Sequence, residues 1–154
     1  MHAPFSPQTE TVWNDEPGHT HGSGTGGGYS TVFSAQDWQI RAPAPPSDRV
    51  SKGDGRMIPD MSANADKKTP YRVFVHGKWM DFYGTSAVAP LFAGLFAAKG
   101  VKLGFITPTL WQHQELFNDI TQGDNGEYHA LVGPDACSGI GAPRDAAAIL
   151  NLFP

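Results

Sequence analysis

The sequence has 154 residues, the length of one ordinary domain, and 40% of them are hydrophobic, so the chain can bury a core. Its formal net charge is -4 without a block of like charges, which argues against a nucleic-acid-binding surface, and no apolar run reaches the ~18 residues of a membrane span. The one cysteine, Cys137, excludes an internal disulfide, and the N-terminus has no signal-peptide pattern, which taken alone suggests a cytoplasmic or incomplete protein.

Residues 1–28 are polar and loop-like, and they end in a glycine-rich run. Such a run can hold phosphate in a P-loop, but the Lys-Ser/Thr pair that must follow it is missing from this sequence. His19 and His21 could share a metal ion, but no third ligand stands near them along the chain. We therefore expect a turning surface loop with solvated histidines.

Residues 29–99 predict short strands, a hairpin and a helix. In chain order we expect a strand at 29–33, a helical turn at 35–39, an extended proline-rich connection at 42–46, a buried strand at 57–63, and a hairpin with arms at 71–75 and 79–82. Gly77, in the turn at 76–78, can adopt a positive φ angle without strain. Strands mixed with helices in this way indicate an α/β protein.

Three helices are expected after the hairpin, two of them in the last segment, residues 100–154. The first runs from about Ser86 to Lys99, with Pro90 in its first turn and Gly100 as its stop. Its many small residues predict a thin helix that packs closely on a sheet and is buried. Thr107 should cap a second helix to about residue 117, and Pro143 should open a third over 144–152.

Ser86 is a candidate nucleophile because it stands at a predicted helix start. The first amides of a helix have no internal acceptor and carry its positive dipole end, so they can stabilise an oxyanion formed when the hydroxyl attacks a carbonyl. Gly84 would let a substrate approach the backbone closely. The alternative is that Ser86 only caps the helix, which is the more common role of serine at such a position.

The motif GTSAVAPLFAG at 84–94 resembles the nucleophile segment of the sedolisins, acid-active serine-carboxyl peptidases with a subtilisin-like fold. Further segments resemble this family in the same order. They are ETVWND at 10–15, GGGYS at 26–30 with Phe33 and Trp38-Gln39, GR at 55–56 with PDMSANAD at 59–66, and the group of Asp119-Ile120, GDNG at 123–126 and GPDACSGIG at 133–141. The matches cover nearly the whole chain, so the resemblance is specific.

The resemblance implies a subtilisin-like three-layer α/β fold with a mostly parallel sheet, of which this chain is the C-terminal portion. In sedolisins a glutamate supported by an aspartate on the same helix activates the serine, and a further aspartate helps form the oxyanion hole. A carboxylate base suits acid pH, where a histidine would already be charged. All three acids belong to family segments that precede Glu10. We therefore expect little or no peptidase activity from this chain alone.

The resemblance also implies a calcium site. Its ligands would be the side chains of Asp119 and Asp135 and the main-chain carbonyls of Ile120, Leu131 and Gly133; Leu131 departs from the glycine that is frequent in the family. Calcium binds about six to eight oxygen atoms of this kind. The alternative is that Asp124-Asn125-Gly126 and Pro134-Asp135 form ordinary turns.

Three functional readings follow from these residues. The chain could be a peptidase fragment, or half of a split peptidase, that cleaves a peptide or protein substrate once the missing part completes it. It could instead be a non-catalytic calcium-binding remnant. A subtilisin-type enzyme with a histidine base is a weaker reading, because neither a His-bearing helix nor an oxyanion asparagine is found. No nucleic-acid or membrane partner is expected, and sedolisins are mostly secreted.

Overall fold

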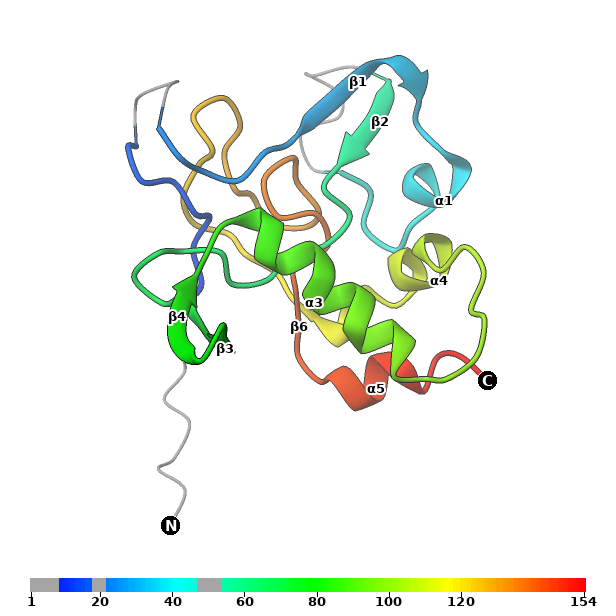
Figure 1. Cartoon of the computed structure of the whole chain (residues 1–154). Helices are drawn as coiled ribbons and strands as arrows, with labels where there is room; N and C mark the ends of the chain where they lie inside the picture. The colour runs from blue at the N-terminus through cyan, green and yellow to red at the C-terminus, as the bar shows by residue number, and fades with distance from the viewer. Residues whose placement is uncertain (1–8, 18–21, 47–53) are drawn as a thin grey trace.

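The computed structural model describes residues 9–17, 22–46 and 54–154 (Figure 1). The predictions for His19, His21 and the first eight residues lie outside these ranges. The elements are the strands β1 (Gly28–Ser34), β2 (Gly55–Ile58), β3 (Tyr71–Val75), β4 (Lys78–Phe82), β5 (Phe117–Asn118) and β6 (Ala142–Pro143), the helices α1 (Asp37–Ile40), α3 (Thr85–Ala97), α4 (Thr107–Gln112) and α5 (Ala146–Leu150), and the 3-10 turn η1 (Gln114–Leu116). The expected combination of strands and helices is thus confirmed for the described residues.

The strands of the described residues form three antiparallel pairs, β1–β2, β3–β4 and β5–β6. The mostly parallel sheet expected from the resemblance is therefore not confirmed. The strand predicted at 57–63 is wrong in its extent: β2 ends at Ile58, because Pro59 has no N–H group to continue the ladder. The strand at 29–33 is confirmed as part of β1.

The β3–β4 hairpin is confirmed, with a tighter turn than expected. Phe74 pairs with Trp79 and Val75 with Lys78, so only His76 and Gly77 form the turn. Their φ angles are 50° and 76°, the left-handed values that a two-residue hairpin turn requires at both central positions. Lys78, which was expected in the turn, belongs to β4.

Two of the predicted helices are shorter than expected. α4 begins at Thr107 without a side-chain cap and ends at Gln112, because His113 leaves the helical region with φ -118° and ψ 47°. α5 begins at Ala146 rather than at 144, because Pro143 pairs with Phe117 in the β5–β6 ladder. The cap of α5 is Asp145, whose carboxylate accepts the amides of Ala147 and Ala148.

The main core packs α1, α4, α5 and the strands β2 and β5 together. Its largest fully buried side chains are Trp111, Phe117, Met57, Leu110 and Ile149. Aromatic contacts extend it: the Trp38 and Trp111 ring centroids are 5.7 Å apart, and those of Phe96 and Phe153 are 6.0 Å apart. A second cluster joins Val12, Ile120, Ala130, Cys137 and Ala142, so the N-terminal segment is part of the folded body.

Helix α3 lies across the molecule with little cover (Figure 1). Of its residues only Val88 is buried, so the prediction of a buried helix is wrong for the described residues. Pro90 lies inside the helix rather than in its first turn, because the helix already begins at Thr85. No helix in ranges 9–17, 22–46 and 54–154 is both long enough and apolar enough to span a membrane.

Candidate functional site

Ser86 is the second residue of α3 and is exposed. The residue before the helix, Gly84, has φ 89° and ψ 163°, a left-handed conformation that favours glycine. Its amide donates to the carbonyl of Ala65 at 2.7 Å, which fixes the start of the helix against the segment that follows β2. The predicted helix-start position of the serine is thus confirmed, and the residue is exposed.

The amino end of α3 keeps free donors beside this hydroxyl. Gly84 has no side chain and makes no cap bond, so no side chain of the N-cap occupies the first amides of the helix. The amide of Ala87 already donates to the Gly84 carbonyl at 3.0 Å, which leaves the amides of Thr85 and Ser86 at the helix end. Positive partial charge from an uncapped helix end is therefore concentrated at Ser86.

No carboxylate or imidazole of the described residues forms a hydrogen bond with Ser86. Of the acids nearest in sequence, Asp66 accepts the amide of Lys68 at 2.9 Å. Asp60 accepts hydrogen bonds from Arg56 and Trp111.

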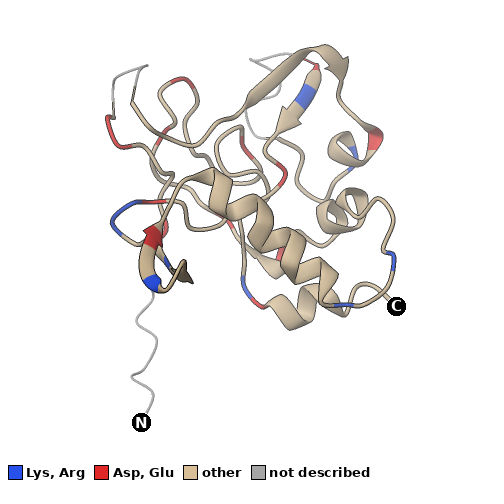
Figure 2. Ribbon diagram, viewed as in Figure 1, with Lys and Arg blue, Asp and Glu red and all other residues tan. Residues whose placement is uncertain are grey.

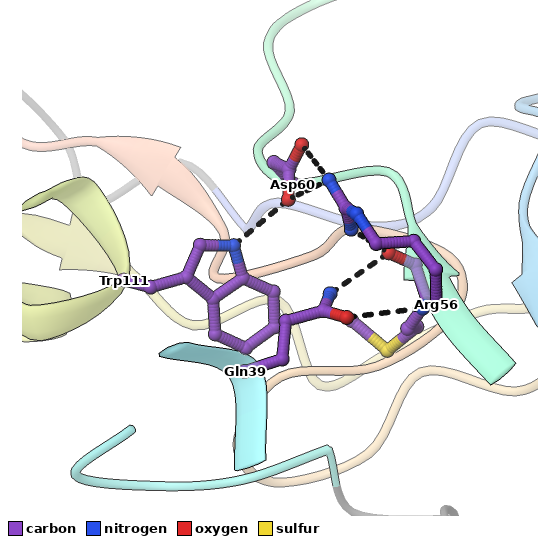
Figure 3. A network of polar contacts seen from close by, with 5 residues as sticks. Gln39, Arg56, Asp60 and Trp111 are labelled. Atoms are coloured by element: carbon purple, nitrogen blue, oxygen red, sulfur yellow. Dashed lines mark hydrogen bonds and ion pairs between the residues drawn. The ribbon is translucent and has the colours of Figure 1, made fainter. Parts of the chain in front are cut away.

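Asp60 is the centre of a polar network that sequence reasoning missed (Figure 3). Its Oδ1 accepts the indole Nε1–H of the fully buried Trp111 at 2.8 Å, and its two oxygens accept Arg56 Nη2 at 2.9 and 2.7 Å. Arg56 also donates to the Met57 carbonyl and lies 4.6 Å from the centre of the Trp38 ring. Asp60 therefore ties the end of β2 to α4.

Gln39 completes this network from α1. Its side chain is fully buried, and it donates to the Met57 carbonyl at 2.9 Å and accepts the Met57 amide at 3.2 Å (Figure 3). The Gln39 side chain thus bonds the N–H and the C=O of Met57 in the way that the backbone of an adjacent strand would. Trp38-Gln39 and Gly55-Arg56 both belong to the motifs that carry the family resemblance, but only the fold shows that they contact each other.

The predicted calcium residues lie close together. Asp119 Oδ2 accepts the amide of Gly133 at 2.7 Å, and Asp135 Oδ2 accepts the amide of Leu131 at 2.9 Å. Ile120 follows Asp119 directly and is buried. Each acid therefore contacts one of the predicted carbonyl residues, Asp119 with Gly133 and Asp135 with Leu131, but it accepts the amide of that residue.

Asp135 is fully buried and strongly hydrogen-bonded. Its Oδ1 accepts the amides of Cys137 and Ser138 and the Ser138 hydroxyl, at 2.9, 2.8 and 3.1 Å. Burial raises the pKa of Asp135 above its ordinary value, and these hydrogen bonds oppose the rise. Among the described residues, no three His, Cys, Asp or Glu side chains are grouped as a metal site, so a cation in this loop would depend on main-chain oxygens as well.

Two glycines allow this loop to pack closely against the backbone of neighbouring segments. A Cβ atom on Gly139 would lie 2.3 Å from the Asp60 carbonyl oxygen, and one on Gly141 would lie 1.9 Å from the Asn118 carbonyl oxygen. The Ile140 amide donates to the Asp60 carbonyl at 2.9 Å. The glycines at 139 and 141 in the GPDACSGIG motif therefore allow close backbone contact. Cys137 is buried beside them and donates to the Tyr128 carbonyl, as expected of a structural residue.

The chain is similar to known peptidases, although no family model matches it. It is 44% identical over 158 residues to kumamolisin of Bacillus sp. (strain MN-32), and the aligned region covers 96% of this chain and 28% of kumamolisin. It is 32% identical over 147 residues to sedolisin of Pseudomonas sp. (strain 101), over 86% of this chain and 24% of that protein.

A solved structure agrees with these similarities. Pseudomonas sedolisin, a serine-carboxyl proteinase in complex with two molecules of pseudo-iodotyrostatin, matches with a TM-score of 0.74 and 30% identity, over 94% of this chain and 41% of that chain. The chain thus spans less than a third of the two curated relatives and less than half of the solved one. The expected subtilisin-like architecture is supported by this match, and the chain is similar, over its own length, to a part of the sedolisin-family peptidases.

Proposed function

We propose that this chain carries the nucleophile, Ser86, of a sedolisin-type serine endopeptidase that acts at acid pH. The observation that supports the proposal most is the exposed residue Ser86 at the uncapped amide end of α3, in a chain 44% identical to kumamolisin. The substrate would be a peptide or protein, bound when the remainder of the domain is present.

The chemistry assigned to these residues is acyl transfer. The Ser86 oxygen attacks the scissile carbonyl carbon, and its proton passes to a carboxylate supplied from outside the described residues. The carbonyl oxygen becomes an oxyanion, which the free amides at the start of α3 stabilise. The carbonyl then re-forms and the amine leaves with a proton, which gives an acyl-enzyme for water to hydrolyse.

The chain alone should have little or no activity, because its described residues place no base at Ser86. Loss of the base from a serine peptidase costs about 10⁶ in turnover. A fluorogenic peptide assay across acid and neutral pH measures this on the 154-residue chain. Robust turnover that Ser86→Ala abolishes would show that the chain holds a complete catalytic set.

We also propose that the loop from Asp119 to Asp135 binds calcium. The donor set suits a hard cation, since it offers two carboxylates within a short loop and main-chain oxygens of Ile120, Leu131 and Gly133 beside them. Bound calcium would hold the loop ends together and would take no part in the acyl transfer.

Thermal unfolding with and without calcium tests this site. We expect the midpoint to rise at millimolar calcium, and the rise to disappear in Asp119→Asn. Asp124→Asn serves as the matched control, because Asp124 accepts bonds from Asn14 and Gly126 and is not a predicted ligand. An unchanged midpoint in the parent chain contradicts the proposal.

A second function is a non-catalytic, calcium-binding remnant of the family. It is favoured by one observation, that the described residues supply no hydrogen-bonding base to Ser86. A reading frame encoding the missing Glu-x-x-x-Asp helix beside this one would support a split peptidase instead. A folded, calcium-stabilised chain without such a neighbour would support the remnant.

A further inference from the structure

Trp13 is held in one place although it belongs to neither apolar core. Its carbonyl accepts the amide of Thr25 at 2.9 Å, and the amides of Val12 and Asp15, one and two residues away, also donate to backbone carbonyls. The two core clusters of the described residues do not include Trp13, and its side chain is partly exposed. A tryptophan that the backbone fixes but the core does not use can offer its ring to a ligand.

The two rings of the Trp13 indole make different contacts. In the five-membered ring, Nε1–H donates to Asp15 Oδ1 at 3.2 Å, and Oδ2 of the same carboxylate lies 2.9 Å from Lys67 Nζ. In the six-membered ring, Cη2 lies 3.9 Å from the point where a Cβ atom of Gly84 would stand. Asp15 therefore anchors the polar end of the side chain, and the apolar end lies beside the residue that precedes α3.

The apolar end of this ring lies close to the proposed nucleophile. Gly84 is the N-cap of α3 and Ser86 is the second residue of the helix, so their Cα atoms are within about 8 Å of each other. Outside the neighbouring backbone, no other atom of the described residues comes within 4 Å of the Gly84 Cβ point. Trp13 and Thr85 also line the same groove along α3. A peptide whose carbonyl carbon is attacked by Ser86 therefore has side chains within reach of the Trp13 ring.

The charges around this position favour an apolar partner for the ring. α3 carries no charged residue from Thr85 to Ala97, as its uniform colour in Figure 2 shows. The carboxylate of Asp15 and the ammonium of Lys67, which lie next to Trp13, neutralise each other in their 2.9 Å ion pair. An aromatic or branched aliphatic side chain gains contact area on such a ring without leaving a charge unpaired.

We propose that Trp13 is a specificity-determining residue of the peptidase site described above. Its ring forms a wall beside Ser86 and packs against an aromatic or branched aliphatic side chain of the substrate, next to the scissile bond. Asp15 is a positioning residue, because it acts on the substrate only through the indole N–H that it binds. This inference rests on the proposed function for the reaction itself.

Steady-state kinetics in a completed domain test this role. This chain replaces the stretch of Bacillus sp. kumamolisin that it matches, and the chimera is given two fluorogenic peptides. The peptides differ only at the two positions that flank the scissile bond, which are phenylalanine in one and alanine in the other. We expect Trp13→Ala to raise KM about 10-fold for the phenylalanine peptide and less than about 2-fold for the alanine peptide, with kcat changed less than about 3-fold. An equal rise of KM for both peptides overturns the inference.

Matched variants separate the loss of this contact from a general loss of folding. Trp79→Ala removes a tryptophan that is 60% exposed on the β3–β4 hairpin, and it should leave both KM values unchanged. Trp13→Phe retains an aromatic ring and should keep KM for the phenylalanine peptide within about 3-fold of the parent. Asp15→Ala should raise that KM by less than Trp13→Ala does, whereas Asp37→Ala should not change it. The inference fails if Trp79→Ala acts like Trp13→Ala, or if Trp13→Phe loses as much as Trp13→Ala.

Peptide binding without cleavage separates this inference from the proposed function. In the chimera with Ser86→Ala, fluorescence anisotropy measures the affinity for the labelled phenylalanine peptide, and adding Trp13→Ala should weaken it about 10-fold. Binding that depends on Trp13, with no cleavage by the chimera that keeps Ser86, defeats the proposed function alone. Cleavage that Ser86→Ala abolishes, but whose KM values do not respond to Trp13→Ala, defeats the specificity role alone. A chimera that neither binds nor cleaves the peptide contradicts both.

Discussion

Replacing Asp60 with alanine removes the acceptor that joins β2 to α4. The Trp111 Nε1–H, which is fully buried, loses its partner, and an unsatisfied buried donor costs about 1–3 kcal/mol. The Arg56 ion pair adds about 1 kcal/mol at most, because the two side chains remain 19% and 26% exposed and are screened by solvent. We expect Asp60→Ala to lower the free energy of unfolding by about 1–4 kcal/mol in total.

The chain contains a matched control for this change. Asp37 and Arg41 have the same i,i+4 spacing, but their side chains are 79–81% exposed and their closest charged atoms are 3.8 Å apart. We expect Asp37→Ala to change the free energy of unfolding by less than about 1 kcal/mol. Urea denaturation of both variants, followed by tryptophan fluorescence and far-ultraviolet circular dichroism, measures the difference.

A double-mutant cycle isolates the Asp60–Trp111 bond. Trp111→Phe removes the indole donor and keeps an aromatic ring in the core, so Asp60→Ala should cost less in that background, by about 1–2 kcal/mol. The reasoning is refuted if Asp60→Ala is no more destabilising than Asp37→Ala, or if the two changes at 60 and 111 add without coupling.

Two further predictions concern the loop and the partly exposed ion pair between Lys67 and Asp15. Gly139→Ala should destabilise the chain by at least about 2 kcal/mol more than Gly77→Ala. Both glycines have a positive φ angle, but only a Cβ atom at position 139 would meet the backbone, at 2.3 Å from the Asp60 carbonyl oxygen. Equal losses of stability in urea denaturation would contradict this prediction. The hydrogen bond from Lys67, 2.9 Å long, lowers the pKa of Asp15. Lys67→Ala should therefore raise the pKa of Asp15 in an NMR titration of the carboxyl groups. An unchanged titration would show that the pair does not persist in solution. Because this pKa is lowered in the folded state, the stability that the pair contributes is present above the ordinary aspartate pKa and is lost as pH falls through the lowered one.

Local signals along the chain determined much of the secondary structure. The pattern of apolar residues with Gly77 between them predicted the β3–β4 hairpin, and Gly84 and Gly100 bounded the helix that carries Ser86. These features depend on neighbours a few residues apart, so a sequence pattern reports them directly. The family motifs likewise identified the sedolisin resemblance, since they depend on residue identity and order.

Tertiary contacts decided the rest. Pro143 enters the β5–β6 pair instead of opening a helix because Phe117 pairs with it, and Asp60 accepts the Trp111 indole N–H across 51 residues. The exposure of α3 was also beyond sequence reasoning, because its composition is that of a buried helix and only the fold shows which faces remain uncovered. Sequence thus determined the local elements and the position of Ser86 at a helix start, whereas contacts between distant segments determined where helices end and which polar groups are paired.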